Sequence, residues 1–302
     1  MGRRIDKKRS VILGYSYSSP MGIWLSIFFV VPLSIIVAYS FMKKGLYGGV
    51  INEFSIKAYK DIFNPNFLST VWRTLWISVL STAICILISI PCSYAMARSK
   101  RQTLLLALVI IPFWTNSLIR IYAWINFLST EGFFNNLLMS LGIISEPLSL
   151  IYNHFSVILV LIYMYLPFAI LPIFTVIDKF DFSLLDAARD LGATKFMSFI
   201  KVMIPNIKSG ITTALVFTFI PMFGAYEVPL LVGGMDSAMV GNIIVDQVQK
   251  TRNWPLAASF SVILTIVSMI GVIWVMRTSR NEVKMKKDNK IAEETFKKEA
   301  KV

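Results

Sequence analysis

The chain has few of the residues from which metal centres and disulfide frameworks are built. Its 302 residues include a single histidine, His154, and two cysteines, Cys85 and Cys92. One histidine excludes a centre built from several histidines, and no cluster has metal-ligand spacing. The cysteines lie seven residues apart in one apolar block. On a helix that is about 10 Å of rise, too far for a disulfide, so we interpret them as packing residues.

Motifs for chemistry are missing as well. The sequence contains no G-x4-G-K-[ST] phosphate loop, so we expect that this chain does not bind ATP itself. A lone histidine in an outer loop leaves no plausible Ser–His pair. We therefore expect no catalytic residues, no metal site and no cofactor, and the missing groups disfavour a membrane enzyme.

Charged residues are scarce, at 16%, whereas 56% of the residues are hydrophobic. A typical soluble domain has roughly a quarter of its residues charged. The mean hydropathy is +0.66, and a soluble domain of this length needs more polar surface than this composition supplies. The net charge of +13 would suit nucleic-acid binding. Because the charges lie at the edges of apolar blocks, membrane topology explains them better, and we expect no nucleic-acid partner.

Six long apolar blocks dominate what is present. A helix needs about 20 apolar residues to cross the hydrocarbon core, and no block has the two-residue alternation of a barrel strand. Because backbone groups in lipid must be satisfied internally, we predict an all-α polytopic membrane protein with six transmembrane helices. The predicted spans are Met21–Phe41, Trp72–Ala97, Leu104–Phe127, Phe155–Ile177, Ile211–Val232 and Leu256–Met276.

Lysine and arginine mark the cytoplasmic side of a membrane protein. They cluster before the first predicted span and after the second, fourth and sixth, and they are sparse in the alternate loops. This pattern predicts a multi-pass protein of the cell (inner) membrane with both termini in the cytoplasm. The predicted parts are a cytoplasmic segment of residues 1–20, a transmembrane domain of residues 21–277 and a basic cytoplasmic tail of residues 278–302. From Asn281 onward we expect a frayed helix or disorder.

Prolines interrupt several of the predicted spans. Neighbouring helices can tolerate such kinks, and a transport pathway can also require broken or bent helices; the sequence leaves both interpretations open. The prolines are Pro32, Pro91, Pro112, Pro167, Pro172 and Pro221.

The cytoplasmic loop of residues 178–210 is long for a helix–helix connection. Ser183 can cap a helix, with Asp186 three residues later in its first turn. Gly192 can end that helix in a left-handed conformation, and a second helical stretch follows that Pro205 closes. The apolar faces are Leu184, Leu185, Ala188 and Leu191 in the first helix, and Phe196, Phe199, Ile200 and Met203 in the second.

Two short amphipathic helices at a membrane surface have two possible roles. They can rest on the lipid, or they can form a docking element for a cytoplasmic partner. Periodicity alone does not separate these interpretations.

Seven positions in this loop resemble the EAA loop of ABC importer permeases. The family pattern is Glu-Ala-Ala, three residues, Gly, nine residues and Ile-x-Leu-Pro. Here Asp186, Ala187, Ala188 and Gly192 are followed at the same spacing by Val-x-Ile and Pro205. In that family the loop forms a coupling helix that sits in a cleft of the ATP-hydrolysing subunit. The resemblance implies that these five residues dock the ATPase.

The resemblance covers roughly residues 20–280. The run Pro112–Tyr122 is similar to the third span of the permeases of spermidine/putrescine importers, the PotB type. It implies an ABC type I importer permease fold that works by alternating access in the lipid bilayer. Its implied partners are a second permease subunit, two copies of an ABC ATPase subunit and an extracytoplasmic polyamine-binding protein.

A polyamine is a flexible polycation, so its recognition calls for carboxylates and aromatic faces. Glu227 is the only carboxylate predicted within a span, and Tyr226 adjoins it. The run that contains them departs from the family pattern, in which an acidic residue lies nearer the following double glycine. Trp114 and Tyr122 are further candidates for the substrate pathway, although they could equally belong to the interfacial aromatic belt, which we expect for Trp124.

The role of Glu227 has an alternative interpretation that involves arginine. Glu227 could pair with Arg120 or Arg73 and only hold the helices together. Arg120 would repel a cation unless it is paired; it could face the outer rim, close a gate or hold an acidic side chain, and we expect a structural role.

Two other functions stay open from the sequence. A permease of the same ABC class could carry another small solute on a similar frame. An ion-coupled secondary transporter would show internally repeated halves and buried carboxylates, but we see no convincing repeat and a single candidate carboxylate.

Overall fold

The computed structural model describes residues 17, 19–273 and 276–277. The predictions for the first 16 residues and for the tail from Asn281 concern residues outside these ranges. The described residues divide into two compact units, one within residues 1–65 and 244–263 and the other within residues 66–243 and 264–302.

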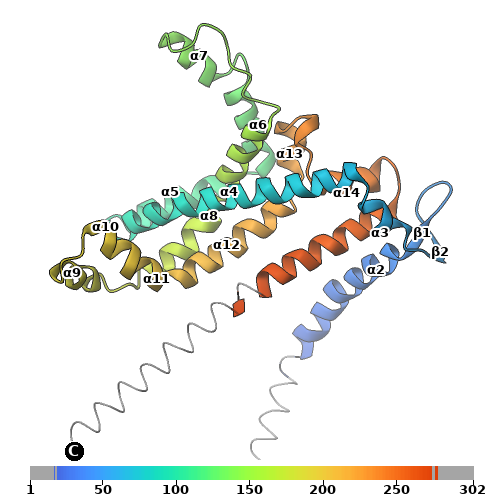
Figure 1. Cartoon of the computed structure of the whole chain (residues 1–302), viewed down its shortest axis with the longest axis horizontal. Coiled ribbons are helices and arrows are strands. Elements are labelled where there is room, and N and C mark those ends of the chain that lie inside the picture. The colour runs from blue at the N-terminus through green and yellow to red at the C-terminus, as the bar shows by residue number, and fades with distance from the viewer. Residues whose placement is uncertain (1–16, 18, 274–275, 278–302) are drawn as a thin grey trace, which may run out of the picture. The chain divides into compact units, whose positions relative to one another are not determined.

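Helices make up nearly all of the regular structure in the described residues, which confirms the all-α prediction apart from one two-stranded hairpin (Figure 1). The first unit contains the helix Ser19–Ser40 with η1 (Ser26–Val30) and α2 (Val31–Ser40) inside it, β1 (Met42–Lys44), β2 (Val50–Phe54), α3 (Lys57–Ile62), most of α14 (Val240–Gln249) and the first half of the helix Trp254–Ile273.

The second unit holds the remaining helices. They are α4 (Pro65–Ala97), α5 (Gln102–Ile110), η2 (Ile111–Trp114), α6 (Ser117–Leu128), α7 (Phe133–Ser140), α8 (His154–Ile177), α9 (Ser183–Asp190), α10 (Lys195–Ser198), η3 (Phe199–Met203), α11 (Ile204–Asn206), α12 (Lys208–Phe223), α13 (Glu227–Val232) and η4 (Met235–Ser237).

Among the described residues, four helices are long and apolar enough to cross a membrane, and two bent helix pairs could bring the number to six. The four are Ser19–Ser40, Pro65–Ala97, His154–Ile177 and Trp254–Ile273. The structure therefore agrees with six spans only if each bent pair counts as one. In the first unit, the most apolar stretch of Ser19–Ser40 has no buried side chain. Such a surface is stable only against lipid or another chain.

The third predicted span, Leu104–Phe127, is broken in the structure. The helix tightens into η2 at Pro112, which has no N–H to donate to the preceding turn. After Thr115 the chain starts α6, and Asn116 caps it by accepting a hydrogen bond from the Leu118 N–H at 2.8 Å. The two halves, Gln102–Trp114 and Ser117–Ser140, are bent by 95°.

The fifth predicted span, Ile211–Val232, is also broken. Helix α12 ends at Phe223 with Gly224 as its C-cap, and α13 starts only at Glu227. Glu227 is therefore the first residue of a separate short helix and does not lie inside a continuous span.

The core of the second unit forms around α8 and α12, which lie side by side (Figure 1). Helix α4 contributes Cys85 to one cluster of this core, and Cys85 is fully buried. Cys92 is half-buried, and both cysteines are free, in keeping with a packing role. Leu185 and Met203, from the segment between α8 and α12, are buried in the same cluster.

Candidate functional site

The segment of residues 178–210, here named the inter-span segment, forms two short helical pieces as predicted, but its first helix is capped differently. Phe182 is the N-cap residue and provides no side-chain hydrogen bond. Asp181 instead accepts a hydrogen bond from the Ser183 N–H at 3.0 Å. Hydrogen bonds from Ser183 lower the pKa of Asp181 below its ordinary value. Because an aspartate can bond a backbone N–H two residues later, Asp181 takes the role that we predicted for Ser183.

Gly192 ends α9 in the left-handed conformation, with φ +88°, as predicted. The Gly192 N–H donates to Arg189 O at 2.8 Å and the Ala193 N–H to Ala188 O at 3.1 Å. This hydrogen-bond pair is the Schellman motif, which fixes the direction in which the chain leaves the helix. The next piece begins at once, because Thr194 caps α10 by accepting from the Met197 N–H.

The prediction that Pro205 closes the second helical piece is wrong. The chain stays helical through Pro205, which lies in the first turn of α11. The π-helical turn η3 immediately before it accommodates a residue without an N–H. The bend of 69° falls between Asn206 and Lys208.

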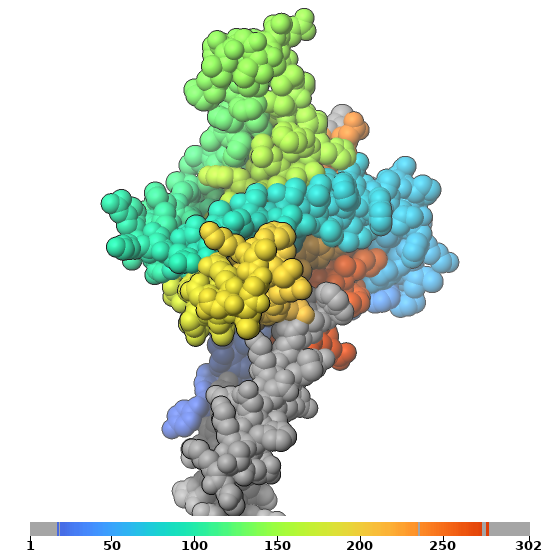
Figure 2. Space-filling model, turned by 60° about the vertical axis from the view of Figure 1, so that its left-hand side comes forward, coloured from blue at the N-terminus to red at the C-terminus, as the bar shows by residue number. Residues whose placement is uncertain are grey.

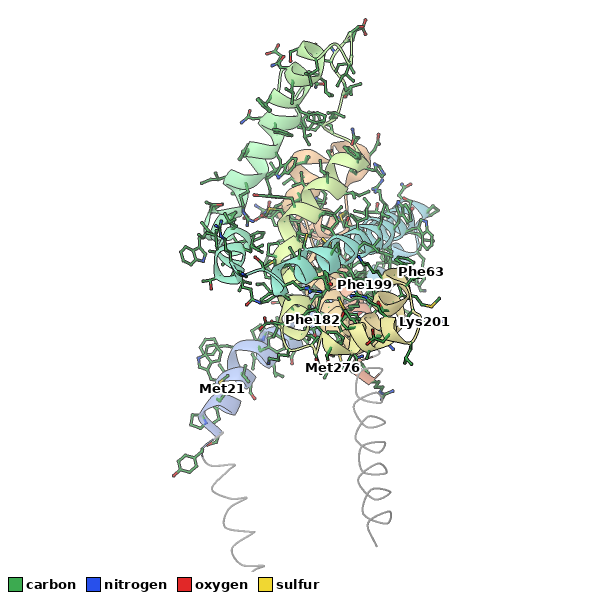
Figure 3. The ribbon with its side chains drawn as sticks, turned by 90° about the vertical axis from the view of Figure 1, so that its left-hand side faces the viewer. Met21, Phe63, Phe182, Phe199, Lys201 and Met276 are labelled. Carbon is green, nitrogen blue, oxygen red and sulfur yellow. The ribbon has the colours of Figure 1, made fainter. Side chains whose placement is uncertain are left out.

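Aromatic contacts attach the inter-span segment to the end of α4. The ring of Tyr94 meets the rings of Phe182 and Phe199 edge-on, with centroids 6.0 and 5.9 Å apart. Figure 3 labels Phe182 and Phe199, the two rings that the inter-span segment contributes. The Arg98 guanidinium lies 5.4 Å from the centroid of Phe182. Leu185 is buried in one cluster with Cys85 of α4 and Ile173 of α8, so the inter-span segment packs against both helices.

The other side of the inter-span segment is exposed, and Figure 2 shows it in yellow on the surface of this unit. Asp186, Ala187, Gly192 and Pro205 are exposed and Ala188 is half-buried. Large apolar side chains accompany them, because Leu191 is 90% and Phe196 is 74% exposed. Exposed apolar side chains gathered around small residues indicate an interaction surface.

A second feature lies where the third and fifth predicted spans break. Helices α6 and α13 contact each other there, and a cavity of about 390 Å³ opens beside them. We name it the carboxylate cavity, because Glu227 lines it. The Ser117 hydroxyl donates a hydrogen bond to Glu227 Oε2 at 3.2 Å. The other lining residues are Arg120, Met164, Tyr165, Phe168, Pro221, Gly224, Ala225, Tyr226 and Val228.

Two residues that the sequence did not single out contact the backbone at the break between α12 and α13. The Asn242 amide donates to Tyr226 O at 3.0 Å, and its oxygen accepts from the Met239 N–H at 2.9 Å. Gly241 lies so close to the break that a Cβ would be 2.6 Å from Ala225 O. The run Gly-Asn at the start of a helix carries no local signal for these contacts, because the partner atoms are about 16 residues earlier in the chain.

We expect Gly241→Ala to destabilise the protein by about 1–3 kcal/mol, because the added methyl group forces the carbonyls at the break to move. The measurement is the thermal unfolding midpoint of the purified protein. Gly271→Ala is the matched control, since a Cβ at Gly271 meets nothing within 4 Å. Equal midpoints for the two variants would show that the break tolerates displacement.

The structure brings only part of the predicted pathway together. Tyr226 and Glu227 share the carboxylate cavity, whereas Trp114 is 83% and Tyr122 is 54% exposed, and neither lines it. Trp124 is half-buried and packs edge-on against Tyr163, with 5.3 Å between the ring centroids.

The alternative in which Glu227 pairs with an arginine does not match the structure. Arg73 donates to Ala238 O at 2.9 Å and to the Thr70 hydroxyl at 3.3 Å. Arg120 faces the same cavity as Glu227, but these described residues form no ion pair within 4.0 Å.

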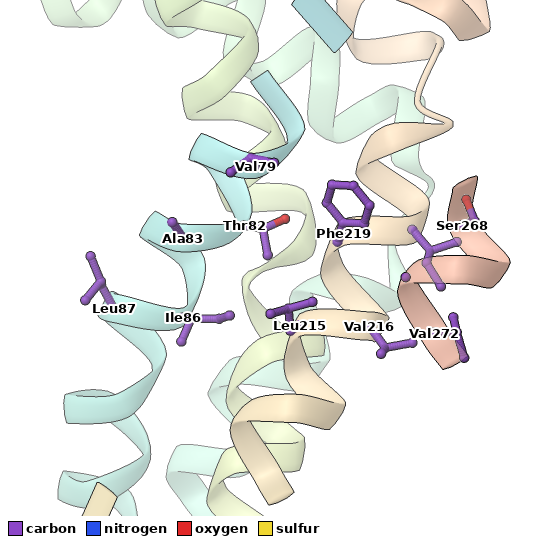
Figure 4. Close-up of a pocket in the computed structure, with 12 residues that line it drawn as sticks. Val79, Thr82, Ala83, Ile86, Leu87, Leu215, Val216, Phe219, Ser268 and Val272 are labelled. Atoms are coloured by element: carbon purple, nitrogen blue, oxygen red, sulfur yellow. The ribbon is translucent and has the colours of Figure 1, made fainter. Parts of the chain in front are cut away.

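A larger cavity of about 510 Å³ has a different character. It lies between α4, α12 and the end of the helix Trp254–Ile273, where side chains such as Thr82, Phe219 and Val272 line it (Figure 4). No charged residue lines this cavity. It therefore lacks the counter-charge that recognition of an ion requires, and the carboxylate cavity is the better candidate. Among the described residues, no group of three or more His, Cys, Asp or Glu side chains could hold a metal ion.

Comparison with protein families and curated proteins gives concordant matches. Residues 85–281 match the family described as "Binding-protein-dependent transport system inner membrane component". The spermidine/putrescine transport system permease protein PotB of Haemophilus influenzae is 37% identical over 259 residues, which are 85% of this chain and 91% of that protein. The PotB protein of Escherichia coli K12 is 36% identical over 85% of this chain and 94% of its own length.

Solved structures share the fold. One chain of the crystal structure of a bacterial ABC transporter involved in the import of the acidic polysaccharide alginate superposes with a TM-score of 0.74 at 18% identity, over 93% of this chain and 99% of that chain. A chain of the inward-facing MetNI methionine ABC transporter superposes with a TM-score of 0.51 at 19% identity, over 70% of this chain and 94% of its own length.

Proposed function

Because the chain belongs to the binding-protein-dependent transport system inner membrane component family, we propose that it is the permease subunit of an ATP-driven importer of polyamines. As a member of that family it is a transport component and a multi-pass membrane protein. The substrate class is suggested by the spermidine/putrescine permeases to which the chain is similar.

The observation that carries the proposal is the position of Glu227. A carboxylate facing a cavity beside broken helices offers a counter-charge to an ammonium group. Its acceptor oxygen is only partly engaged, by the neutral hydroxyl of Ser117. Tyr226 and Tyr165 add aromatic surface to the same cavity, which favours an organic cation.

The exposed side of the inter-span segment is the proposed docking surface for an ABC ATPase subunit. Asp186, Ala187, Ala188, Gly192 and Pro205 would enter a cleft of that subunit. The exposed apolar side chains beside them would be covered on docking, which supports this use over a surface facing water. This assignment places the segment, and with it both termini, in the cytoplasm.

The assembly would contain this chain, a second permease subunit, two ATPase copies and an extracytoplasmic polyamine-binding protein. Residues 21–277 would form the permease domain, preceded by the cytoplasmic segment 1–20 and followed by the basic tail 278–302. Trp114 and Tyr122 are exposed in this single chain and would reach the pathway only where it is completed by the second permease subunit.

Coupling would follow the contacts of the inter-span segment. ATP binding must favour one of two conformations of the permease through a difference in contacts. Closure of the ATPase pair would displace α9, and the buried Leu185 and the aromatic contacts of Tyr94 would carry that displacement to α8 and α4. Met164, Tyr165 and Phe168, in the middle of α8, line the carboxylate cavity, so a displacement of α8 would open or close it.

The test is ATP hydrolysis in liposomes that contain this chain with its partner permease, ATPase and binding protein. We expect spermidine or putrescine to stimulate hydrolysis. If the complex assembles but neither amine changes the rate of ATP hydrolysis, the chain would still belong to an importer of this class, and its substrate would be another small solute. Failure to assemble with any ATPase would contradict the proposal and favour an ion-coupled transporter.

A further inference from the structure

The first unit contains a small cavity with three lysines in its wall. It has a volume of about 260 Å³ and lies between β1, α3 and the start of the helix Trp254–Ile273. We name it the lysine cavity; its polar lining includes Lys43, Lys44, Lys57, Asp61 and Asn253. Because three lysines outnumber the one carboxylate, the lining carries a net positive charge.

Two of the three lysines have no anion that neutralises them. Lys43 is bound to Glu53 of β2, with 2.9 Å between Nζ and Oε2. Lys44 and Lys57 are exposed and form no ion pair within 4.0 Å with any described residue. The helix Trp254–Ile273 also begins at this cavity, and the N-terminus of a helix favours a negative charge. The lysine cavity is therefore suited to an anion.

An apolar groove lies next to the lysine cavity. It has a volume of about 310 Å³, it lies between α2, α14 and the helix Trp254–Ile273, and no charged residue lines it. Ile36 and Val248 contribute aliphatic surface to it. The two hollows are adjacent at the start of one helix, because Asn253 and Pro255 line the cavity and Trp254 lines the groove.

Aromatic rings mark the level at which the cavity adjoins the groove. Tyr39 and Trp254 both line the groove and stack with their ring centroids 6.3 Å apart. Tyrosine and tryptophan are enriched where the hydrocarbon of a bilayer meets the headgroups. Tyr39 lies near the end of the apolar helix Ser19–Ser40, and β1 and β2 follow that end (Figure 1). The groove is therefore at the depth of acyl chains and the lysines are at the depth of headgroups.

We propose that the lysine cavity and the apolar groove together bind a phospholipid with an anionic headgroup, of the phosphatidylglycerol type. The ammonium groups of Lys44 and Lys57 bind the phosphate, and one acyl chain lies in the groove. The Asp61 carboxylate, which would repel a bare phosphate, accepts hydrogen bonds from the hydroxyl groups of the glycerol headgroup. The site requires only that the chain lies in a membrane, so it does not rest on the proposed function.

The combination of hollows favours a lipid over the acidic surface of a soluble protein. An acidic protein surface would engage the exposed lysines, but it would leave the apolar groove and the aromatic pair beside them without a partner. A phospholipid supplies a phosphate and an acyl chain in one molecule. Its two parts match the order in which charge and apolar surface follow each other here.

The experiment is native mass spectrometry of the full-length protein in detergent, titrated with phosphatidylglycerol, phosphatidylethanolamine and phosphatidylcholine of identical acyl chains. We expect the first phosphatidylglycerol to bind at least about fivefold more tightly than either zwitterionic lipid, and Lys44→Gln and Lys57→Gln each to weaken it about fivefold. Lys60→Gln is the matched control and should change little, because Lys60 is exposed on the same helix but does not line the cavity.

A second pair of variants tests the apolar groove. Val248 lines it and is 42% exposed, so Val248→Trp should fill the groove and weaken the binding of phosphatidylglycerol several-fold. Val30→Trp, at an exposed position of the helix Ser19–Ser40 outside the groove, should not. Glycerol phosphate carries the charge without an acyl chain, so it should compete only at concentrations at least about a hundredfold higher.

Four results would overturn the site. Equal affinity for the anionic and zwitterionic lipids in the unmodified protein is the first, and it needs no variant. An effect of Lys60→Gln as large as that of Lys44→Gln would reduce the preference to general surface charge. Competition by glycerol phosphate as strong as that by the lipid would indicate a soluble phosphate compound. Unchanged lipid affinity in Lys44→Gln, with weaker stimulation of ATP hydrolysis by the binding protein, would reassign the lysines to a protein interface.

The lipid measurements use neither the ATPase nor a polyamine. A failure of the lipid site therefore leaves the proposed importer function untouched, and a failure of polyamines to stimulate ATP hydrolysis leaves the lipid site untouched.

Discussion

Glu227→Gln should reduce the uptake of polyamines at least about tenfold, because glutamine keeps the size and the hydrogen-bonding capacity of the side chain but removes the counter-charge of the cavity. Ser117 can still donate to the amide oxygen, so the break between α12 and α13 should keep its geometry. The measurement is uptake of radiolabelled putrescine into liposomes, with the apparent affinity and the maximal rate determined separately.

The matched control is Glu131→Gln, which removes an exposed carboxylate on the connection between α6 and α7. It should leave uptake unchanged. Both variants should assemble with the ATPase as the parent protein does, because neither residue lies in the inter-span segment. If Glu227→Gln kept both the affinity and the maximal rate, Glu227 would lie outside the pathway, and the polyamine assignment would lose its structural support.

Gly192→Leu should abolish transport and transport-linked ATP hydrolysis while leaving membrane insertion intact. A Cβ at Gly192 meets nothing within 4 Å in this chain, so the added side chain would project from the exposed surface of the inter-span segment. It would therefore obstruct a docked partner and not the fold. The cost within the chain is the left-handed backbone, roughly 1–2 kcal/mol for a non-glycine residue.

Gly142→Leu separates the two effects. Gly142 has φ +68° and, like Gly192, nothing within 4 Å of an added Cβ, but it lies between α7 and α8, away from the inter-span segment. This variant should carry the same backbone cost and still support uptake. Gly192→Asn adds a side chain that tolerates the left-handed conformation, so it should impair transport through bulk alone. Normal uptake by Gly192→Leu would contradict the docking surface.

The inter-span segment could be predicted from the sequence because its structure depends mainly on residues close together in the chain. The end of α9 at Gly192 depends on one residue type at one position. The predicted apolar face was a poorer guide to burial, because Leu185 is buried whereas Leu184 and Leu191 are exposed. Even here the cap was assigned to Ser183 where Asp181 provides it, since both residues have the right chemistry and only the backbone path selects between them.

The carboxylate cavity could be predicted only in part. Glu227 was singled out because a carboxylate in an apolar block is rare, and Tyr226 because it is adjacent. An arginine was one possible partner, but the structure gives it Ser117, 110 positions away in the sequence. Asn242 and Gly241 escaped notice because a buried amide and a close backbone approach have no periodic pattern to reveal them.

By itself, the sequence determined that this protein is helical and lies in a membrane. It also determined that the inter-span segment resembles the EAA loop of ABC importer permeases. Both follow from runs of apolar residues and short motifs, which act through neighbours along the chain. Only the tertiary structure decided where two spans break and that Arg120 stays apart from Glu227. Those outcomes depend on contacts between residues distant in the sequence, whose energies compete with one another and leave no local signature.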